Sequence, residues 1–202
     1  MDSLDKRLSE TVAARLCHDL VSPLSTLTAL MPQSADVAAQ ALLCEAAEAM
    51  RRRLHLFCLL FGAMEEASWD DLPALLRGSP AAHRVRFGFG GAPAGLNARS
   101  ARLLAGAALL GAEALPRGGE VSVTATDADS FALLPAGRGA AWPEAALRLA
   151  AGGDVGVALE EGPRRILSPW VFLLARAAGR RLSFSLPGSA GIPALVVSAP
   201  GG

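Results

Sequence analysis

The sequence lacks both a long apolar run and an excess of charge of either sign. Its longest fully apolar stretches, such as residues 103–112, are about half as long as the ~20 residues that cross a bilayer. No basic segment followed by an apolar one opens the chain, which argues against a signal peptide. Lysine and arginine together number 19, as do aspartate and glutamate, and this balance predicts no nucleic-acid partner. We therefore expect a cytoplasmic protein that binds neither nucleic acid nor a membrane.

Lysine and cysteine are scarce. Lys6 is the only lysine, so a phosphate-binding loop with its lysine is absent. The odd number of cysteines, all in segments that look helical, predicts small buried side chains in a reducing compartment rather than disulfide partners. These cysteines are Cys17, Cys44 and Cys58. Apolar residues make up 51% of the chain and charged residues 19%, which is typical of a globular protein. No metal site and no cofactor are expected.

What the sequence does contain is a histidine, an acid and a proline close together, in residues 15–23 with the sequence RLCHDLVSP. Apolar residues around them recur in steps of three or four, which predicts one apolar stripe of a helix. The stripe consists of Val12, Leu16, Leu20, Leu24, Leu27 and Met31. At about 3.6 residues per turn, His18 lies roughly 200° around the helix axis from Leu16 and from Leu20. Its imidazole should therefore point away from the core.

The neighbours of His18 suit phosphohistidine chemistry. A neutral imidazole nitrogen can attack an aspartyl phosphate on a partner and later return the phosphoryl group. Pro23 has no N–H for the Asp19 carbonyl, so the helix should loosen or kink just after the histidine. Asp19 and the Ser22 hydroxyl are candidates for holding the tautomer of His18. The residues expected to contact a partner are Arg15, Val21, Ser22 and Ser25. An ordinary surface histidine ahead of a proline kink would have the same local pattern.

Residues 12–23 resemble the phosphorylation helix of the ChpT-type histidine phosphotransferases of alphaproteobacteria. Their core, His-Asp/Glu-Leu-x-Ser/Thr-Pro, is also the general H-box of sensor histidine kinases. Residues 100–123 and 168–180 are similar to the same family, so the resemblance spans nearly the whole chain. It implies a homodimer with a central four-helix bundle and a C-terminal domain shaped like a kinase ATP-binding domain that binds no ATP. It also implies a relay from the receiver domain of a hybrid histidine kinase, through His18, to response regulators.

The predicted fold class is α+β, in two domains. Residues 1–66 are expected to form a helical hairpin for dimerisation and histidine phosphotransfer, and residues 67–202 a degenerate, Bergerat-type α/β sandwich like the ATP-binding domain of histidine kinases. Ser34 or Asp36 can cap the second helix of the hairpin. Helices are expected at about residues 4–31, 37–64, 97–115, 143–151 and 168–178. Strands are expected at about residues 84–89, 120–126, 130–134, 182–186 and 194–198.

The second helix of the hairpin ends in the apolar run of residues 54–61, more apolar surface than two isolated helices can cover. At roughly 25 cal/mol per Å² of buried apolar area, a second copy of the hairpin would be favoured. Two copies would form a four-helix bundle across a two-fold axis. The other interpretation is that this face packs on the chain's own C-terminal half. The arginines at 51–53 are expected on a solvated face.

The groups with which a histidine kinase holds ATP are missing from the sequence. Where the resemblance places a magnesium-binding Asn, residues 110–115 read LGAEAL, and Pro135 replaces the acid of Asp-x-Gly-x-Gly. The glycine lid before the last long helix has become residues 164–169, RRILSP, in which the proline donates no N–H to a phosphate. These absences argue against one alternative, an ATP-dependent sensor histidine kinase core. A non-catalytic binding module or kinase inhibitor that uses the H-box helix as a docking surface is the other.

Overall fold

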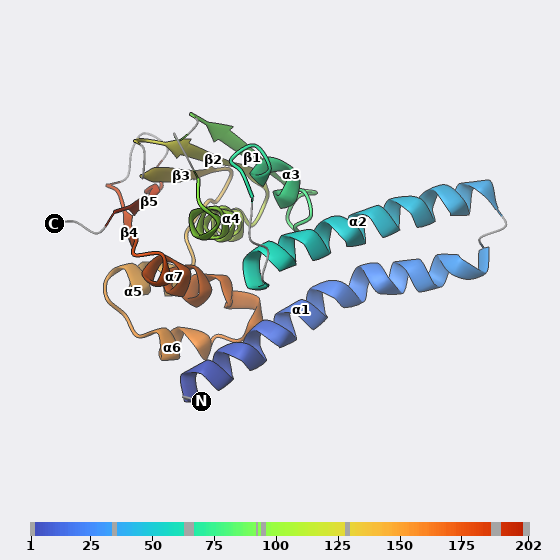
Figure 1. Cartoon of the computed structure of the whole chain (residues 1–202), viewed down its shortest axis with the longest axis horizontal. Helices are drawn as coiled ribbons and strands as arrows, with labels where there is room; N and C mark the ends of the chain where they lie inside the picture. The colour runs from blue at the N-terminus through green and yellow to red at the C-terminus, as the bar shows by residue number, and fades with distance from the viewer. Residues whose placement is uncertain are drawn as a thin grey trace.

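The computed structural model describes residues 3–33, 36–62, 67–91, 93, 96–127, 130–186 and 191–199. A helical hairpin at the N-terminus projects from a mixed α/β sandwich (Figure 1). The predicted fold class, a helical hairpin followed by an α/β sandwich, is confirmed. Within the described residues, no helix is long and apolar enough to cross a membrane.

The hairpin consists of α1 (Ser3–Leu30) and α2 (Val37–Phe61), with a turn of 3-10 helix, η1 (Met31–Gln33), after α1. α1 continues through Pro23 to its end. Asp36 caps α2, since its side chain accepts a hydrogen bond from the Ala38 N–H at 3.1 Å. Ser34, the other candidate cap, lies outside the described residues. α2 ends three residues before the predicted position 64, because the extended backbone of Gly62 leaves the helical conformation.

The sandwich contains a five-stranded sheet in the order β1-β2-β3-β5-β4. Its strands are β1 (Val85–Gly90), β2 (Gly119–Ala125), β3 (Phe131–Ala136), β4 (Arg181–Phe184) and β5 (Leu195–Ser198). β1 and β2 are parallel, and the other neighbouring strands are antiparallel. All five lie within two residues of the predicted positions. The sequence pattern therefore predicted where the strands lie, whereas the structure shows which strands pair and in which direction.

Helices α4 (Ala98–Glu113), α5 (Glu144–Ala150) and α7 (Leu167–Ala177) pack together and against the sheet (Figure 1). Asn97 caps α4 as predicted, and its side chain accepts a hydrogen bond from the Ser100 N–H at 2.9 Å. α4 is apolar on almost every side and is buried along most of its length. A helix with no polar face belongs inside a domain, so α4 is the centre of the core.

Two short helices and a turn of 3-10 helix were not predicted. They are α3 (Leu72–Leu76), α6 (Val155–Leu159) and η2 (Pro163–Arg165). Elements of three to five residues are too short to display a helical period. α6 and η2 both contact α1, and Arg7 on α1 donates a hydrogen bond to the Gly156 carbonyl at 3.2 Å. α6 and η2 therefore bring the sandwich into contact with the first helix of the hairpin.

The apolar end of α2 packs on the chain's own sandwich. Leu56, Leu59 and Leu60 are at most 1% exposed and belong to the same core as α4 and α7. The ring of Phe61 lies 5.2 Å from the ring of Trp170 on α7. The expectation that this run faces a second copy is wrong for these side chains, because the sandwich supplies the apolar surface that they need.

Polar contacts fasten the same end of α2. A helix leaves its last four carbonyls without partners inside the helix. Arg102 on α4 donates to the Leu59 carbonyl at 2.8 Å and also to the Gly62 carbonyl, while the Trp170 indole donates to the Leu60 carbonyl at 3.2 Å. Just after α3, a Cβ on Gly78 would collide with the Arg52 carbonyl oxygen. Hairpin and sandwich are thus joined by directional bonds as well as by burial.

The cysteines are exposed in the single chain, so their predicted burial is wrong. Cys17, Cys44 and Cys58 are all free thiols on the hairpin. Each lies off the buried side of its helix, as Cys58 does between the buried Phe57 and Leu59.

Candidate functional site

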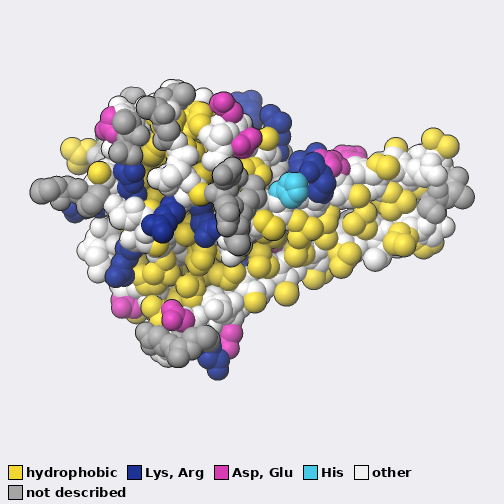
Figure 2. Space-filling view, viewed as in Figure 1, with side chains coloured by type: hydrophobic (Ala, Val, Ile, Leu, Met, Phe, Trp, Pro, Cys, Tyr) yellow, Lys and Arg dark blue, Asp and Glu magenta, His cyan; other side chains and the backbone are white. Residues whose placement is uncertain are grey.

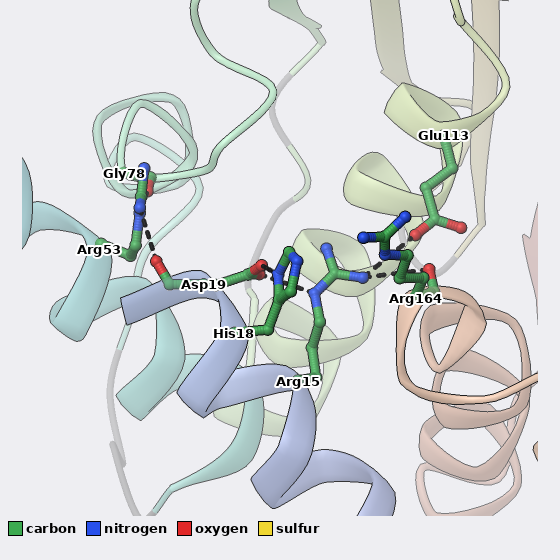
Figure 3. Close-up of polar contacts among 7 residues, drawn as sticks. All are labelled: Arg15, His18, Asp19, Arg53, Gly78, Glu113 and Arg164. Atoms are coloured by element: carbon green, nitrogen blue, oxygen red, sulfur yellow. Dashed lines mark hydrogen bonds and ion pairs between the residues drawn. The ribbon is translucent and has the colours of Figure 1, made fainter. Parts of the chain in front are cut away.

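His18 lies on α1 where the hairpin meets the sandwich (Figure 3). Its side chain is 58% exposed, which confirms that the imidazole does not face the core. Nδ1 of His18 lies 2.9 Å from Oδ1 of Asp19. An ionised carboxylate only accepts hydrogen bonds, so Nδ1 carries the proton in the neutral ring and Nε2 keeps a free lone pair. Of the two tautomer-holding candidates, Asp19 is the one in contact with the ring.

Asp19 is held from its other side as well. Its side chain is 7% exposed, and Arg15, one helical turn earlier, donates from Nε to Oδ2 at 2.7 Å. Each carboxylate oxygen therefore has its own partner, His18 on one and Arg15 on the other. A charge-assisted hydrogen bond of this kind is stronger than a neutral one, so the carboxylate has a fixed orientation beside the imidazole.

Arg15 faces inward. Its side chain is 19% exposed, Nη1 donates to the Arg164 carbonyl of η2 at 3.1 Å, and the same nitrogen lies 3.8 Å from Oε1 of Glu113. Arg15 therefore connects α1 with α4 and η2 (Figure 3). The guanidinium is thus already bonded within the chain. The expected contact of Arg15 with a partner stays a prediction.

Glu113 is one of the site residues that sequence reasoning missed. Its side chain is 17% exposed, and Oε2 is buried without a hydrogen-bond partner among the residues that the structure describes. Burial raises the pKa of Glu113 to about 7, although the nearby Arg15 and Arg165 oppose the increase. The signal available in the sequence was an acid placed directly after the apolar residues 103–112.

Pro23 leaves the Asp19 carbonyl without its helical donor, and Arg53 of α2 replaces it. Nη1 of Arg53 donates to the Asp19 carbonyl at 2.7 Å, and its Nε reaches the Gly78 carbonyl at 3.5 Å. Burial lowers the pKa of Arg53, and Asp19 partly offsets this effect. The prediction of a solvated face is wrong for Arg53, which is half-buried because the freed carbonyl lies within the helix contact.

The remaining predicted contact residues lie on the exposed side of α1. Val21, Ser22 and Ser25 are all exposed, and the Ser25 hydroxyl donates to the Val21 carbonyl at 2.8 Å. The structure does not bring the Ser22 hydroxyl to a ring nitrogen of His18; the described contact of the ring is with Asp19. Ser22 therefore lies beside His18 on the surface without holding its tautomer.

A cavity of ≈ 300 Å³ lies between the hairpin and the sandwich, next to this cluster. Asp19, Arg15 and Glu113 line it together with aromatic and aliphatic side chains such as Phe57 and Leu109. Within the described ranges, no three His, Cys, Asp or Glu side chains gather in a way that could hold a metal ion.

The positions at which a kinase domain would hold ATP have other surroundings here. Pro135 lies inside β3, opposite Val121 of β2. The carboxyl of Glu113 faces Arg15, and the lid segment begins in η2 and ends in α7, with the Arg164 carbonyl of η2 also accepting from Arg15. Two of the three positions therefore contribute to the environment of His18.

Comparison with known proteins adds a family and a fold. The sequence model of a family described as the histidine phosphotransferase C-terminal domain matches residues 69–190. Among solved structures, the 1.7 Å structure of a bacterial phosphotransferase is 25% identical, with 98% of each chain covered and a TM-score of 0.76. The cytoplasmic segment of the histidine kinase QseC is 16% identical over 80% of this chain and 95% of that chain, with a TM-score of 0.34. No curated protein matches the sequence.

Proposed function

Since the chain belongs to the histidine phosphotransferase family, we propose that it relays a phosphoryl group through His18 from the receiver domain of a hybrid histidine kinase to response regulators. It does so without using ATP itself. Residues 1–66 carry the phosphorylated histidine, and residues 67–202 form the degenerate ATPase-like domain. The family and the similarity to a bacterial phosphotransferase support phosphotransfer, whereas the donor, the recipients and the direction are part of the proposal.

The observation that carries the proposal is the exposed ring of His18, with Nδ1 held by Asp19 and Nε2 free. Nε2 attacks the phosphorus of an aspartyl phosphate on the receiver, so that an N–P bond forms and the acyl O–P bond breaks. The receiver carboxylate leaves with the electron pair, and the Nδ1 proton stays between the ring and Asp19. The reverse steps return the phosphoryl group to a second receiver.

The proposed receiver contact is the exposed surface of α1 around His18. Val21, Ser22 and Ser25 follow His18 along α1 and are exposed, and small or polar side chains let another protein approach closely. A receiver must dock and leave in every cycle, which calls for a modest and partly polar interface. Arg15 contributes indirectly, because its hydrogen bond to Asp19 fixes the carboxylate that holds the His18 ring.

The proposed homodimer uses the part of the hairpin that lies away from the sandwich. Large apolar side chains are exposed there in the single chain, namely Leu24, Met31, Val37 and Leu42. Figure 2 shows hydrophobic side chains along the projecting hairpin. An exposed apolar surface of this kind marks an interaction site, and a second hairpin would cover it in a four-helix bundle.

The test is phosphotransfer from a purified, phosphorylated receiver domain of the organism that encodes the chain. The wild-type protein should acquire an acid-labile, base-stable phosphoryl group, and His18→Ala should acquire none while its fold is unchanged, because an exposed side chain contributes little to packing. His55→Ala, which removes another exposed histidine of the hairpin, is the matched control and should label normally. Mg-ATP without a receiver should give no label.

Three other outcomes would each indicate a different site or function. Persistent labelling of His18→Ala would show that another residue carries the phosphoryl group. Labelling by Mg-ATP alone would favour an ATP-dependent kinase. A receiver that binds tightly and never transfers its phosphate would favour a docking module or kinase inhibitor.

A further inference from the structure

Glu113 occupies an unfavourable position for an acid. It ends α4, whose preceding residues are apolar and almost entirely buried. A negative charge at the C-terminal end of a helix is opposed by the helix dipole, and a buried carboxyl without full hydrogen bonding is costly to ionise. The unpartnered Oε2 adds to that cost. Packing alone does not explain this residue, because an apolar side chain would suit the position better.

One guanidinium connects Glu113 with the phosphoacceptor. Nη1 of Arg15 lies 3.8 Å from Oε1 of Glu113, and Nε of the same group lies 2.7 Å from Oδ2 of Asp19. The other oxygen of Asp19 lies 2.9 Å from Nδ1 of His18 (Figure 3). The guanidinium is a rigid plane, so a change at its Glu113 side alters its bond to Asp19.

The charged groups around Glu113 come from several elements. Arg15 and Asp19 belong to α1, Arg84 directly precedes β1, and Arg165 belongs to η2. His83 lines the same cavity. Burial, the largest influence, favours the neutral carboxyl, as does Asp19, whereas the arginines favour the carboxylate, and the resulting pKa is about 7. Glu113 therefore exchanges its proton near neutral pH.

We propose that Glu113 is a positioning residue for phosphoryl transfer, which acts on His18 through Arg15 and Asp19 and makes the transfer rate depend on its own ionisation. An ionised Glu113 shares the positive charge of Arg15, which leaves Asp19 more negative charge with which to hold the Nδ1 proton of His18. Nε2 is then the better nucleophile. A neutral Glu113 leaves Arg15 to Asp19 alone, and Asp19 holds the ring less strongly. The inference rests on the proposed role of His18 as phosphoacceptor.

The decisive variant is Glu113→Gln, which keeps the shape of the side chain and removes its ionisation. The rate of phosphoryl uptake from a phosphorylated receiver is measured for the full chain from about pH 6 to about pH 8. Above pH 7 the variant should be slower than wild type by about threefold to tenfold, the size expected for a change within a coupled network. Near pH 6 the two rates should converge, because wild-type Glu113 is then mostly neutral. Glu45→Gln, an exposed acid of α2, should follow wild type throughout.

A second measurement needs no receiver. The ¹⁵N NMR signals of the His18 ring report how much of the neutral imidazole carries its proton on Nδ1. That fraction should rise in the wild-type chain as Glu113 ionises, and in Glu113→Gln this rise should be absent. A role in packing alone would lower stability without altering the tautomer.

The outcomes separate the two proposals. A wild-type chain that takes up no phosphoryl group on His18 rejects the proposed function, and the NMR comparison still shows whether Glu113 governs the ring. A wild-type chain that labels on His18, with a rate profile that coincides with that of Glu113→Gln, overturns the inference whatever the spectra show.

Discussion

At the residue scale, Asp19 has three separate tasks. Oδ1 holds the His18 ring, Oδ2 accepts from Arg15, and its carbonyl accepts from Arg53 on the neighbouring helix. The carboxylate of Asp19 thus bonds side chains of α1, and its carbonyl bonds a side chain of α2. The orientation of the ring therefore depends on how the two helices pack, as well as on the sequence next to His18.

Glu113 should make the stability of the fold depend on pH. Its folded pKa of about 7 lies above the ordinary value of 4.5, so the folded chain keeps a proton that the unfolded chain has released. The stability present below pH 4.5 is therefore lost as the pH rises through about 7, at a cost of up to about 3 kcal/mol. In urea unfolding, Glu113→Gln should match wild type near pH 4.5 and exceed it by up to that amount at pH 8.

Glu45→Gln is the control for this comparison and should show no such trend. A difference between Glu113→Gln and wild type that stays constant with pH would contradict the buried, titrating carboxyl.

At the element scale, Pro23 on α1 and Arg53 on α2 form a complementary pair. The proline frees the Asp19 carbonyl, and the arginine occupies it at 2.7 Å. Arg53→Leu should cost about 1–3 kcal/mol in the free energy of unfolding, because the carbonyl of the buried Asp19 is left without a donor. In a Pro23→Ala background the new backbone N–H supplies that donor, so the same substitution should cost about 1 kcal/mol less.

Urea unfolding of wild type, both single variants and the double variant measures this coupling. Arg51→Leu is the matched control, since Arg51 is exposed and bonds only Glu48 among the described contacts. Strictly additive effects of Pro23→Ala and Arg53→Leu would show that the arginine does not replace the missing helical bond.

The elements also show which parts of the structure were predictable from the sequence. The apolar stripe of α1 predicted the exposure of His18, and turn residues with alternating patterns located the strands, because both signals are local. The partner of residues 54–61 was not predictable, since burial of apolar surface has no direction. Arg53 and Glu113 were missed for a related reason. Their partners are distant in sequence, and only the packing of α1 against α2 and against the sandwich brings them to the site.

At the scale of the whole molecule, the two apolar surfaces of the hairpin should respond differently to a charge. Leu42→Glu lies on the exposed apolar part, where the side chain is 52% exposed, and should yield a folded monomer by light scattering. Leu60→Glu buries a charge in a core where the side chain is 1% exposed, and should unfold the chain. Leu147→Glu, at an exposed leucine of the sandwich, is the matched control.

Leu147→Glu should remain a dimer like wild type. A wild-type chain that is monomeric at micromolar concentration would contradict the dimer. A Leu42→Glu variant that stays dimeric would show that the dimer contact lies elsewhere.

The openness of His18 limits how long the chain can keep a signal. With 58% of the side chain exposed, a phosphoryl group on Nε2 would stand in bulk water, and the hairpin and sandwich would not shelter it from hydrolysis. Under the proposed function the protein therefore passes the phosphoryl group on and does not store it. The transfer rate would depend on how often receivers collide with the protein, and with few recipient receivers the phosphohistidine would hydrolyse before transfer.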